Sequence, residues 1–118
     1  MSATVFSMVI SNIILLVLGQ TLWKIGLRKI EFTLTPSGIL GAVLNPFIFA
    51  GLCIYAAATI IWFYVLSKSD ISAVYPIQSL CYVIAALTGV FILGENVSAI
   101  RWVGLACISM GAVLVARG

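Results

Sequence analysis

Hydrophobic residues fill four stretches of the chain, each about 20 residues long, and polar residues gather in the segments between them. None of these stretches contains an acidic side chain. A helix of about 20 apolar residues spans the roughly 30 Å hydrocarbon layer of a membrane, and it pairs all of its backbone polar groups internally. The pattern predicts an all-α membrane protein with one domain, residues 1–118, and four transmembrane helices at residues 3–23, 46–66, 71–93 and 97–116.

The longest connection, between the first two spans, predicts a short helix of its own. Thr35 followed by Pro36 is typical of an N-cap with proline at the first helical position, and the helix would run through Leu44. Residues 45–46, Asn-Pro, repeat the signal. We therefore expect a bend between this short helix and the second span.

The composition excludes several classes of protein. The chain is 64% hydrophobic and 8% charged, whereas soluble domains have about 25% charged residues. Barrel strands alternate between apolar and polar residues, and these runs are continuous. The chain has no histidine, no nucleophile-and-base spacing and no nucleotide motif. We therefore expect no enzyme activity, no cofactor, no metal site and no nucleic-acid partner, and we interpret the three cysteines as small packing residues.

Residues at the ends of the spans indicate whether the first span is cleaved off and how the chain is oriented in the membrane. No basic residue precedes the first span and no small-residue cleavage site follows it, so we expect it to be retained. Four cations lie on the side of the first connection and two on the side of the termini. This bias weakly favours termini outside and is small enough to permit dual insertion. The four are Lys24, Arg28, Lys29 and Arg101, and the two are Lys68 and Arg117.

The end of the first span combines an amide with a cation. Gln20 and Lys24 are one helical turn apart and share a face, an arrangement suited to a phosphate group. The alternative is a lysine that extends to the headgroups and anchors the topology. Arg101, one turn into the fourth span, either pairs with Glu95 or reaches a lipid phosphate.

A polar and aromatic stripe follows one face of the third span. Tyr75, Gln78, Ser79 and Tyr82 recur at i, i+3, i+4 and i+7. Polar groups are costly in lipid, so the stripe should face protein or a water-filled cavity. It would either bind a substrate or form hydrogen bonds between helices only. Pro76 removes one backbone donor and should bend the helix near Tyr75.

The second span presents aromatic rings on one face. Tyr55 and Trp62 are seven residues apart, with Thr59 between them. Such rings can stack on a sugar or line an acyl groove. Aromatic residues also gather at membrane interfaces and in packing contacts, so both interpretations stay open.

The fourth span contains a small-residue pair. Gly104 and Gly111 are seven residues apart and lie on nearly the same helical face, which allows another backbone to approach closely. Four helices enclose little space, so we expect an oligomer. The glycines fit a dimer interface or packing within one chain.

Four motifs spread over nearly the whole chain carry a family resemblance: Gly19-Gln20-x-x-x-Lys24, Ala73-Val74-Tyr75-Pro76-x-x-Ser79-Leu80, Leu93-Gly94-Glu95 and Gly104-x6-Gly111. Together they resemble the drug/metabolite transporter superfamily. Within it the chain is similar to the short EamA-type proteins, above all to the small subunits that flip aminoarabinose-phosphoundecaprenol across a bacterial inner membrane. The resemblance implies a lipid-linked sugar phosphate as substrate, membrane lipids around it, and a homodimer or a heterodimer with a similar short subunit.

Two positions differ from the more distantly similar small multidrug resistance exporters. Their proton-exchanging glutamate in the first span would fall at Leu16, and their tryptophan in the third span at Gln78. A proton-coupled cation exporter needs a carboxylate within the membrane, and all three acidic residues of this chain lie in connections.

The leading hypothesis is a transporter subunit of the bacterial inner membrane that flips a polyprenyl-phosphate-linked sugar. Lys24, helped by Gln20 and Arg101, would hold the phosphate, while the stripe of the third span lodges the sugar. The two subunits would move against each other to expose the cavity alternately. The alternatives are a small multidrug resistance-like exporter of small molecules and an accessory subunit without transport activity.

Overall fold

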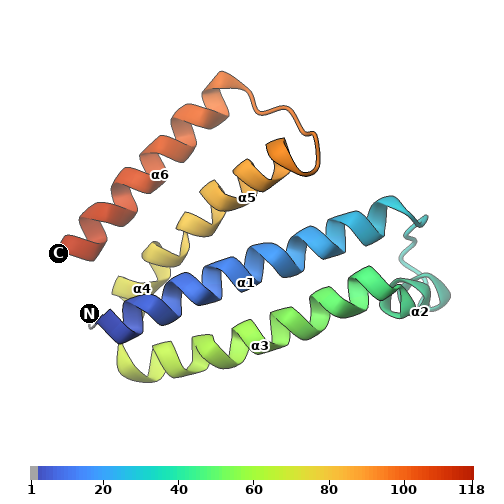
Figure 1. Ribbon diagram of the computed structural model, residues 1–118, viewed down its shortest axis with the longest axis horizontal. Coiled ribbons are helices and arrows are strands. Elements are labelled where there is room, and N and C mark those ends of the chain that lie inside the picture. The colour runs from blue at the N-terminus through green and yellow to red at the C-terminus, as the bar shows by residue number, and fades with distance from the viewer. Residues whose placement is uncertain (1–2) are drawn as a thin grey trace.

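The computed structural model describes residues 3–118, and every regular element in that range is a helix (Figure 1). Four helical stretches are long and apolar enough to cross a membrane: α1, α3, α4 together with α5, and α6. This confirms the predicted all-α membrane fold. The first two residues of the predicted domain lie outside the described range. The helices are α1 Ala3–Arg28, α2 Pro36–Leu44, α3 Pro46–Lys68, α4 Ile71–Gln78, α5 Leu80–Phe91 and α6 Ala99–Arg117.

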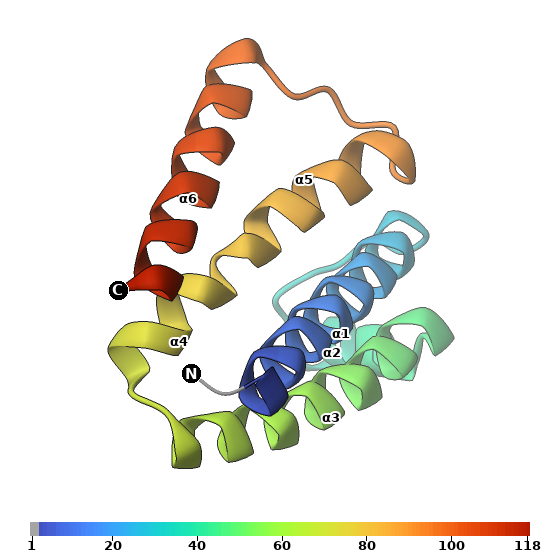
Figure 2. The same ribbon diagram turned by 60° about the vertical axis from the view of Figure 1, so that its left-hand side comes forward.

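Helices α1 and α3 form a long antiparallel pair, side by side in both views (Figures 1 and 2). Their backbones approach closely at Gly19 and Gly51. A methyl group added at Gly51 would lie 2.6 Å from the carbonyl oxygen of Gly19 and 2.5 Å from Cδ1 of Trp23. Small residues permit such close helix packing in membranes, so these two glycines set the spacing of the pair.

The buried apolar core lies toward the end of the molecule where α1 begins and α3 ends. It brings α1, α3 and α4 together through β-branched side chains. Many large apolar residues outside this core are exposed, such as Phe63, Phe91 and Ile100, as expected for a surface in contact with lipid. The fully buried or nearly buried core residues are Val5, Val9, Ile13, Val65, Val74 and Ile77.

The third span differs from the continuous helix predicted over residues 71–93. The structure interrupts it at Ser79, between α4 and α5, and ends α5 at Phe91. Pro76 supplies the reason, because it has no N–H to donate and its ring strains the preceding turn. The backbone N–H of Ser79 donates to the Pro76 carbonyl at 3.1 Å, and the Ser79 hydroxyl bonds to the same oxygen.

The predicted short helix is confirmed as α2. The Thr35 hydroxyl accepts a hydrogen bond from the N–H of Gly38 at 3.1 Å, and Asn45 caps α3 through the N–H groups of Phe47 and Ile48. Helix α6 packs against α4 and α5 and not against the α1–α3 pair. The start of α1 and the end of α6 lie at the same end of the bundle (Figures 1 and 2).

Candidate functional site

A cavity of about 230 Å³ opens among α1, α3 and α4, and a buried amide lies beside it. Asn12 has no exposed surface. Its Nδ2 donates to the Ala58 carbonyl at 2.7 Å, and its Oδ1 accepts from Nε2 of Gln78 at 2.8 Å. This pair of bonds ties the three helices together at one level. The cavity is lined by Asn12, Leu16, Tyr55, Thr59, Trp62, Tyr75 and Gln78.

Aromatic rings form two sides of the cavity. Trp62 of α3 meets Tyr75 of α4 edge to face, with ring centroids 6.2 Å apart and planes at 64°. Tyr55 lies against Trp23 of α1, with centroids 5.0 Å apart. The Trp23 and Tyr55 rings are tilted by 32°, and the edge-to-face arrangement of Trp62 and Tyr75 is one of the preferred aromatic geometries. The cavity therefore combines amide groups with fixed rings, which suits a small polar molecule with apolar faces.

A second group of polar residues lies at the far end of α1. The Glu95 carboxylate is 3.9 Å from Nζ of Lys24 and 3.8 Å from Nη2 of Arg28. Nη1 of Arg28 also donates to the Leu93 carbonyl at 3.0 Å. Lys24 follows Asn12 by 12 residues, about 18 Å along a helix. The cation cluster is thus well separated from the amide-lined cavity.

Glu95, one of the two partners expected for Arg101, pairs with other residues. Within residues 3–118 Glu95 pairs with the two cations of α1 and not with Arg101. The connection between α5 and α6 turns the carboxylate toward α1, while Ser98 caps α6 by accepting from the Arg101 N–H at 3.3 Å. Arg101 and Glu95 both line an open cavity of about 330 Å³ beside α5 and α6, without forming an ion pair there.

The structure divides the predicted site residues. Tyr55, Trp62, Tyr75 and Gln78 come together around the amide-lined cavity. The others lie outside its lining, so the single stripe of the third span does not continue past the interruption. Ser79 turns to its own backbone, and Tyr82 is 58% exposed. The residues outside the lining are Gln20, Lys24, Ser79, Tyr82 and Arg101.

The sequence interpretation missed Asn12 as a member of the site. An amide in an otherwise apolar span was the available signal, because polar side chains are costly in the membrane and mark functional positions. Leu16, one turn further along α1, and Thr59 were noted without a role in the cavity. Asn12 holds the central position because its side chain forms hydrogen bonds to both α3 and α4.

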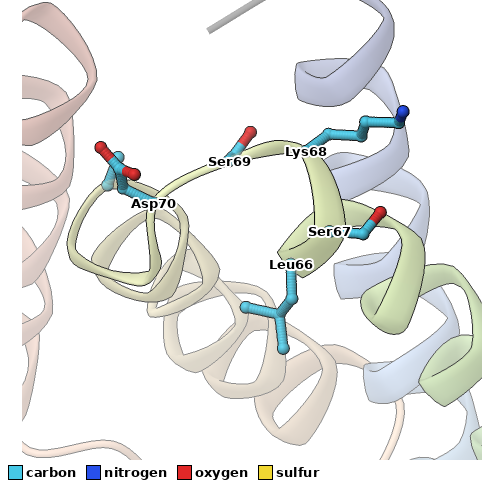
Figure 3. A pocket seen from close by; sticks show the side chains of 6 residues that line it. Leu66, Ser67, Lys68, Ser69 and Asp70 are labelled. Atoms are coloured by element: carbon cyan, nitrogen blue, oxygen red, sulfur yellow. The ribbon is translucent and has the colours of Figure 1, made fainter.

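A cavity of about 560 Å³ lies at the turn between α3 and α4 (Figure 3). Its lining comes from this one segment, Leu66 to Asp70 and Ala73. The side chains of Lys68 and Asp70 point away from each other (Figure 3). It is the concave side of the turn that joins α3 to α4 and gathers no groups from the other described helices. In the part of the chain that the structure describes, no cluster of three metal-binding side chains occurs either.

The glycines of α6 face open space. A methyl group added at Gly104 or Gly111 would have no neighbour within 4 Å. Packing within the chain therefore does not explain the pair. A dimer contact through this face stays a prediction.

Comparison with known proteins gives one family match. The model of the EamA-like transporter family matches residues 1–117. No solved structure gives a significant match to the chain.

Three relatives share the same name, "Probable 4-amino-4-deoxy-L-arabinose-phosphoundecaprenol flippase subunit ArnE". The one from Pseudomonas savastanoi pv. phaseolicola is 26% identical over 110 residues, covering 93% of this chain and 95% of the relative. That from Proteus mirabilis is 37% identical over 54 residues, 46% of this chain and 48% of the relative. That from Pseudomonas fluorescens is 26% identical over 82 residues, 70% and 72% of the two chains.

Proposed function

The chain belongs to the EamA-like transporter family and is a multi-pass membrane transporter, and we propose that it flips a polyprenyl-phosphate-linked sugar across the bacterial inner membrane. The observation that carries the proposal is the layout of α1. This one helix presents cations near its end and a buried amide in a cavity about 18 Å away. A lipid-linked sugar has an anionic phosphate and a polar sugar ring that are bonded directly and cannot span about 18 Å, so the two sites would receive the headgroup one after the other.

The phosphate would bind at the end of α1. Lys24 and Arg28 are half exposed there and supply charged donors, which form the stronger class of hydrogen bond with phosphate oxygens. Gln20 precedes Lys24 by one turn and adds an amide. Arg28 takes the helping role that the sequence interpretation gave to Arg101.

The sugar would enter the cavity beside Asn12. Its hydroxyl groups can exchange hydrogen bonds with the amides of Asn12 and Gln78, and its apolar face can stack on Trp62. The cavity volume of about 230 Å³ lies below the roughly 300–1,000 Å³ of drug-sized sites. The cavity therefore suits one sugar ring, while the polyprenyl tail remains in the bilayer.

A cation exporter finds less support in this geometry. A carboxylate in the membrane would serve that activity, and position 16, beside the cavity, carries leucine. An accessory subunit without transport activity would need only the amide pair as a contact between helices. Transport by the purified protein separates these functions.

The direct test is reconstitution into vesicles that contain a labelled polyprenyl-phosphate sugar. We expect the protein to move the labelled headgroup between leaflets and to leave a quaternary ammonium compound untransported, because the cations near the end of α1 favour an anion. Chemical or enzymatic access to the label from outside measures the movement. Proton-coupled efflux of the quaternary ammonium compound, or a leaflet exchange equal to that of protein-free vesicles, would contradict the proposal.

The transporter would work as a dimer through α6, and the word "subunit" in the names of the relatives supports a partner. Replacing Gly104 and Gly111 together by leucine fills the open face and should separate the two backbones, so crosslinked dimer should fall at least several-fold. Replacing Val103 and Met110, exposed neighbours of the two glycines, by leucine is the matched control. An unchanged dimer in the glycine variant would place the contact elsewhere.

A further inference from the structure

The Glu95 side chain lies in the space left by the missing side chain of Gly89. The backbone N–H of Glu95 donates to the Gly89 carbonyl at 2.8 Å, and its side chain lies over Gly89, which is buried. A methyl group added at Gly89 would come within 2.6 Å of Oε1 of Glu95. The absent side chain at position 89 therefore lets the carboxylate lie along α5 and reach α1.

The contacts that the carboxylate makes with α1 are weak. Its distances to Lys24 and Arg28, 3.9 and 3.8 Å, exceed hydrogen-bond length, and the three side chains are 43–51% exposed. Exposed ion pairs of this kind contribute about 0–1 kcal/mol each. Arg28 also binds the Leu93 carbonyl at 3.0 Å. The same two cations thus hold the α5–α6 connection, residues 92–98, against α1.

The interface next to this contact is loosely packed. An apolar cavity of about 190 Å³ lies between α1 and α5 and extends to Ile92, the last residue before Leu93. Since α6 packs on α4 and α5 and not on α1, a movement of α5 away from α1 would carry α6 with it. The weak ion pairs therefore hold together one end of the loosely packed interface between α1 and α5.

From these contacts we propose that Glu95 is an internal anion that holds the phosphate site in the empty transporter and is displaced by the phosphate group of a lipid. The proposal rests on the proposed function, because it takes Lys24 and Arg28 as the phosphate ligands. A phosphate offers several charged acceptor oxygens to the two cations and forms shorter bonds than the carboxylate does here. Its binding would release residues 92–98 from α1. Binding of the headgroup would therefore open the interface between α1 and α5.

Binding to protein in nanodiscs of neutral lipid tests the displacement, with farnesyl phosphate and inorganic phosphate as probes. Glu95→Gln removes the competing charge and keeps the shape, so farnesyl phosphate should bind about fivefold tighter, the effect of one like charge about 4 Å away in water. Gly89→Ala keeps the charge of Glu95 but displaces its carboxylate from the space beside position 89. Farnesyl phosphate should therefore bind more tightly to this variant as well.

Gly41→Ala is the matched control, because a methyl group there meets nothing within 4 Å and should leave the affinity unchanged. Unchanged or weaker binding in both Glu95→Gln and Gly89→Ala would overturn the displacement. Inorganic phosphate bound as tightly as farnesyl phosphate would overturn the assignment to a lipid and leave a site for free anions.

Spin labels test the release. In a variant without the native cysteines, labels at Glu31→Cys and Asn96→Cys report the distance between the end of α1 and the connection. Farnesyl phosphate should lengthen or broaden this distance, and Glu95→Gln should do so without a probe. A pair at positions 31 and 67, which lie at opposite ends of the antiparallel α1–α3 pair, should not change.

The two proposals fail differently. If Lys24→Gln abolishes phosphate binding while Glu95→Gln changes neither affinity nor distance, the displacement is wrong and the flippase stands. If native protein binds neither probe, both are wrong.

Discussion

Lys24→Glu is expected to abolish flipping of a polyprenyl-phosphate sugar, with a rate at least about a hundredfold below that of the native protein. The substitution places a second carboxylate within reach of Glu95 and Arg28, so the phosphate would meet net negative charge where it now meets cations. An attraction of about 1–4 kcal/mol at 4 Å becomes a repulsion of similar size, and each 1.4 kcal/mol changes a rate about tenfold. Headgroup movement in reconstituted vesicles measures the effect.

Two further variants distinguish a change of charge at the proposed phosphate site from a change in the net charge of the protein. Lys24→Arg should keep part of the rate, because guanidinium also binds phosphate but with a different geometry. Lys29→Glu makes the same change in net charge and in the bias that orients the spans, yet the Lys29 ammonium lies 4.1 Å above the Phe47 ring and away from Glu95. Lys29→Glu should therefore flip lipid near the native rate. Equal losses in both glutamate variants would indicate a topology defect and no phosphate site at Lys24.

The sequence was sufficient for features determined by local chemistry. Hydrophobic length identified the helical spans, since lipid requires every backbone group to be paired within a helix. The cap of α2 followed from Thr35 and Pro36, because a hydroxyl at the N-cap and proline at the first helical position act within a single turn. Neither inference depends on how one helix packs against another.

The features that the sequence did not reveal depend on packing between helices. Asn12 reaches Gln78 across 66 positions, and their bond requires both the register of α1 on α3 and the interruption at Ser79. Glu95 pairs with Lys24 and Arg28 of α1 because Gly89 leaves space for its side chain. Helical periodicity describes one element at a time, so it placed polar residues on faces without showing which faces meet.

The contact between Gly19 and Gly51 provides the largest expected effect on folding. A methyl group at Gly51 would already lie 2.6 Å from the Gly19 carbonyl oxygen, a backbone atom that no side-chain rotation can move. Overpacking of this kind costs about 1–3 kcal/mol and sometimes more. Leucine is larger still, so Gly51→Leu should force α1 from α3, break the bond from Asn12 to the Ala58 carbonyl and open the wall formed by Tyr55.

We expect Gly51→Leu to lower the midpoint of thermal unfolding in detergent by at least several degrees, measured by circular dichroism, and to abolish flipping. Gly41→Leu is the matched control, because its position in α2 has no neighbour within 4 Å of an added methyl group and should keep the native midpoint. Gly51→Ala should fall between the two, since the Trp23 ring can turn aside while the Gly19 carbonyl cannot. A native midpoint and rate in Gly51→Leu would mean that α1 and α3 do not pack backbone to backbone, and the cavity between them would have to be redrawn.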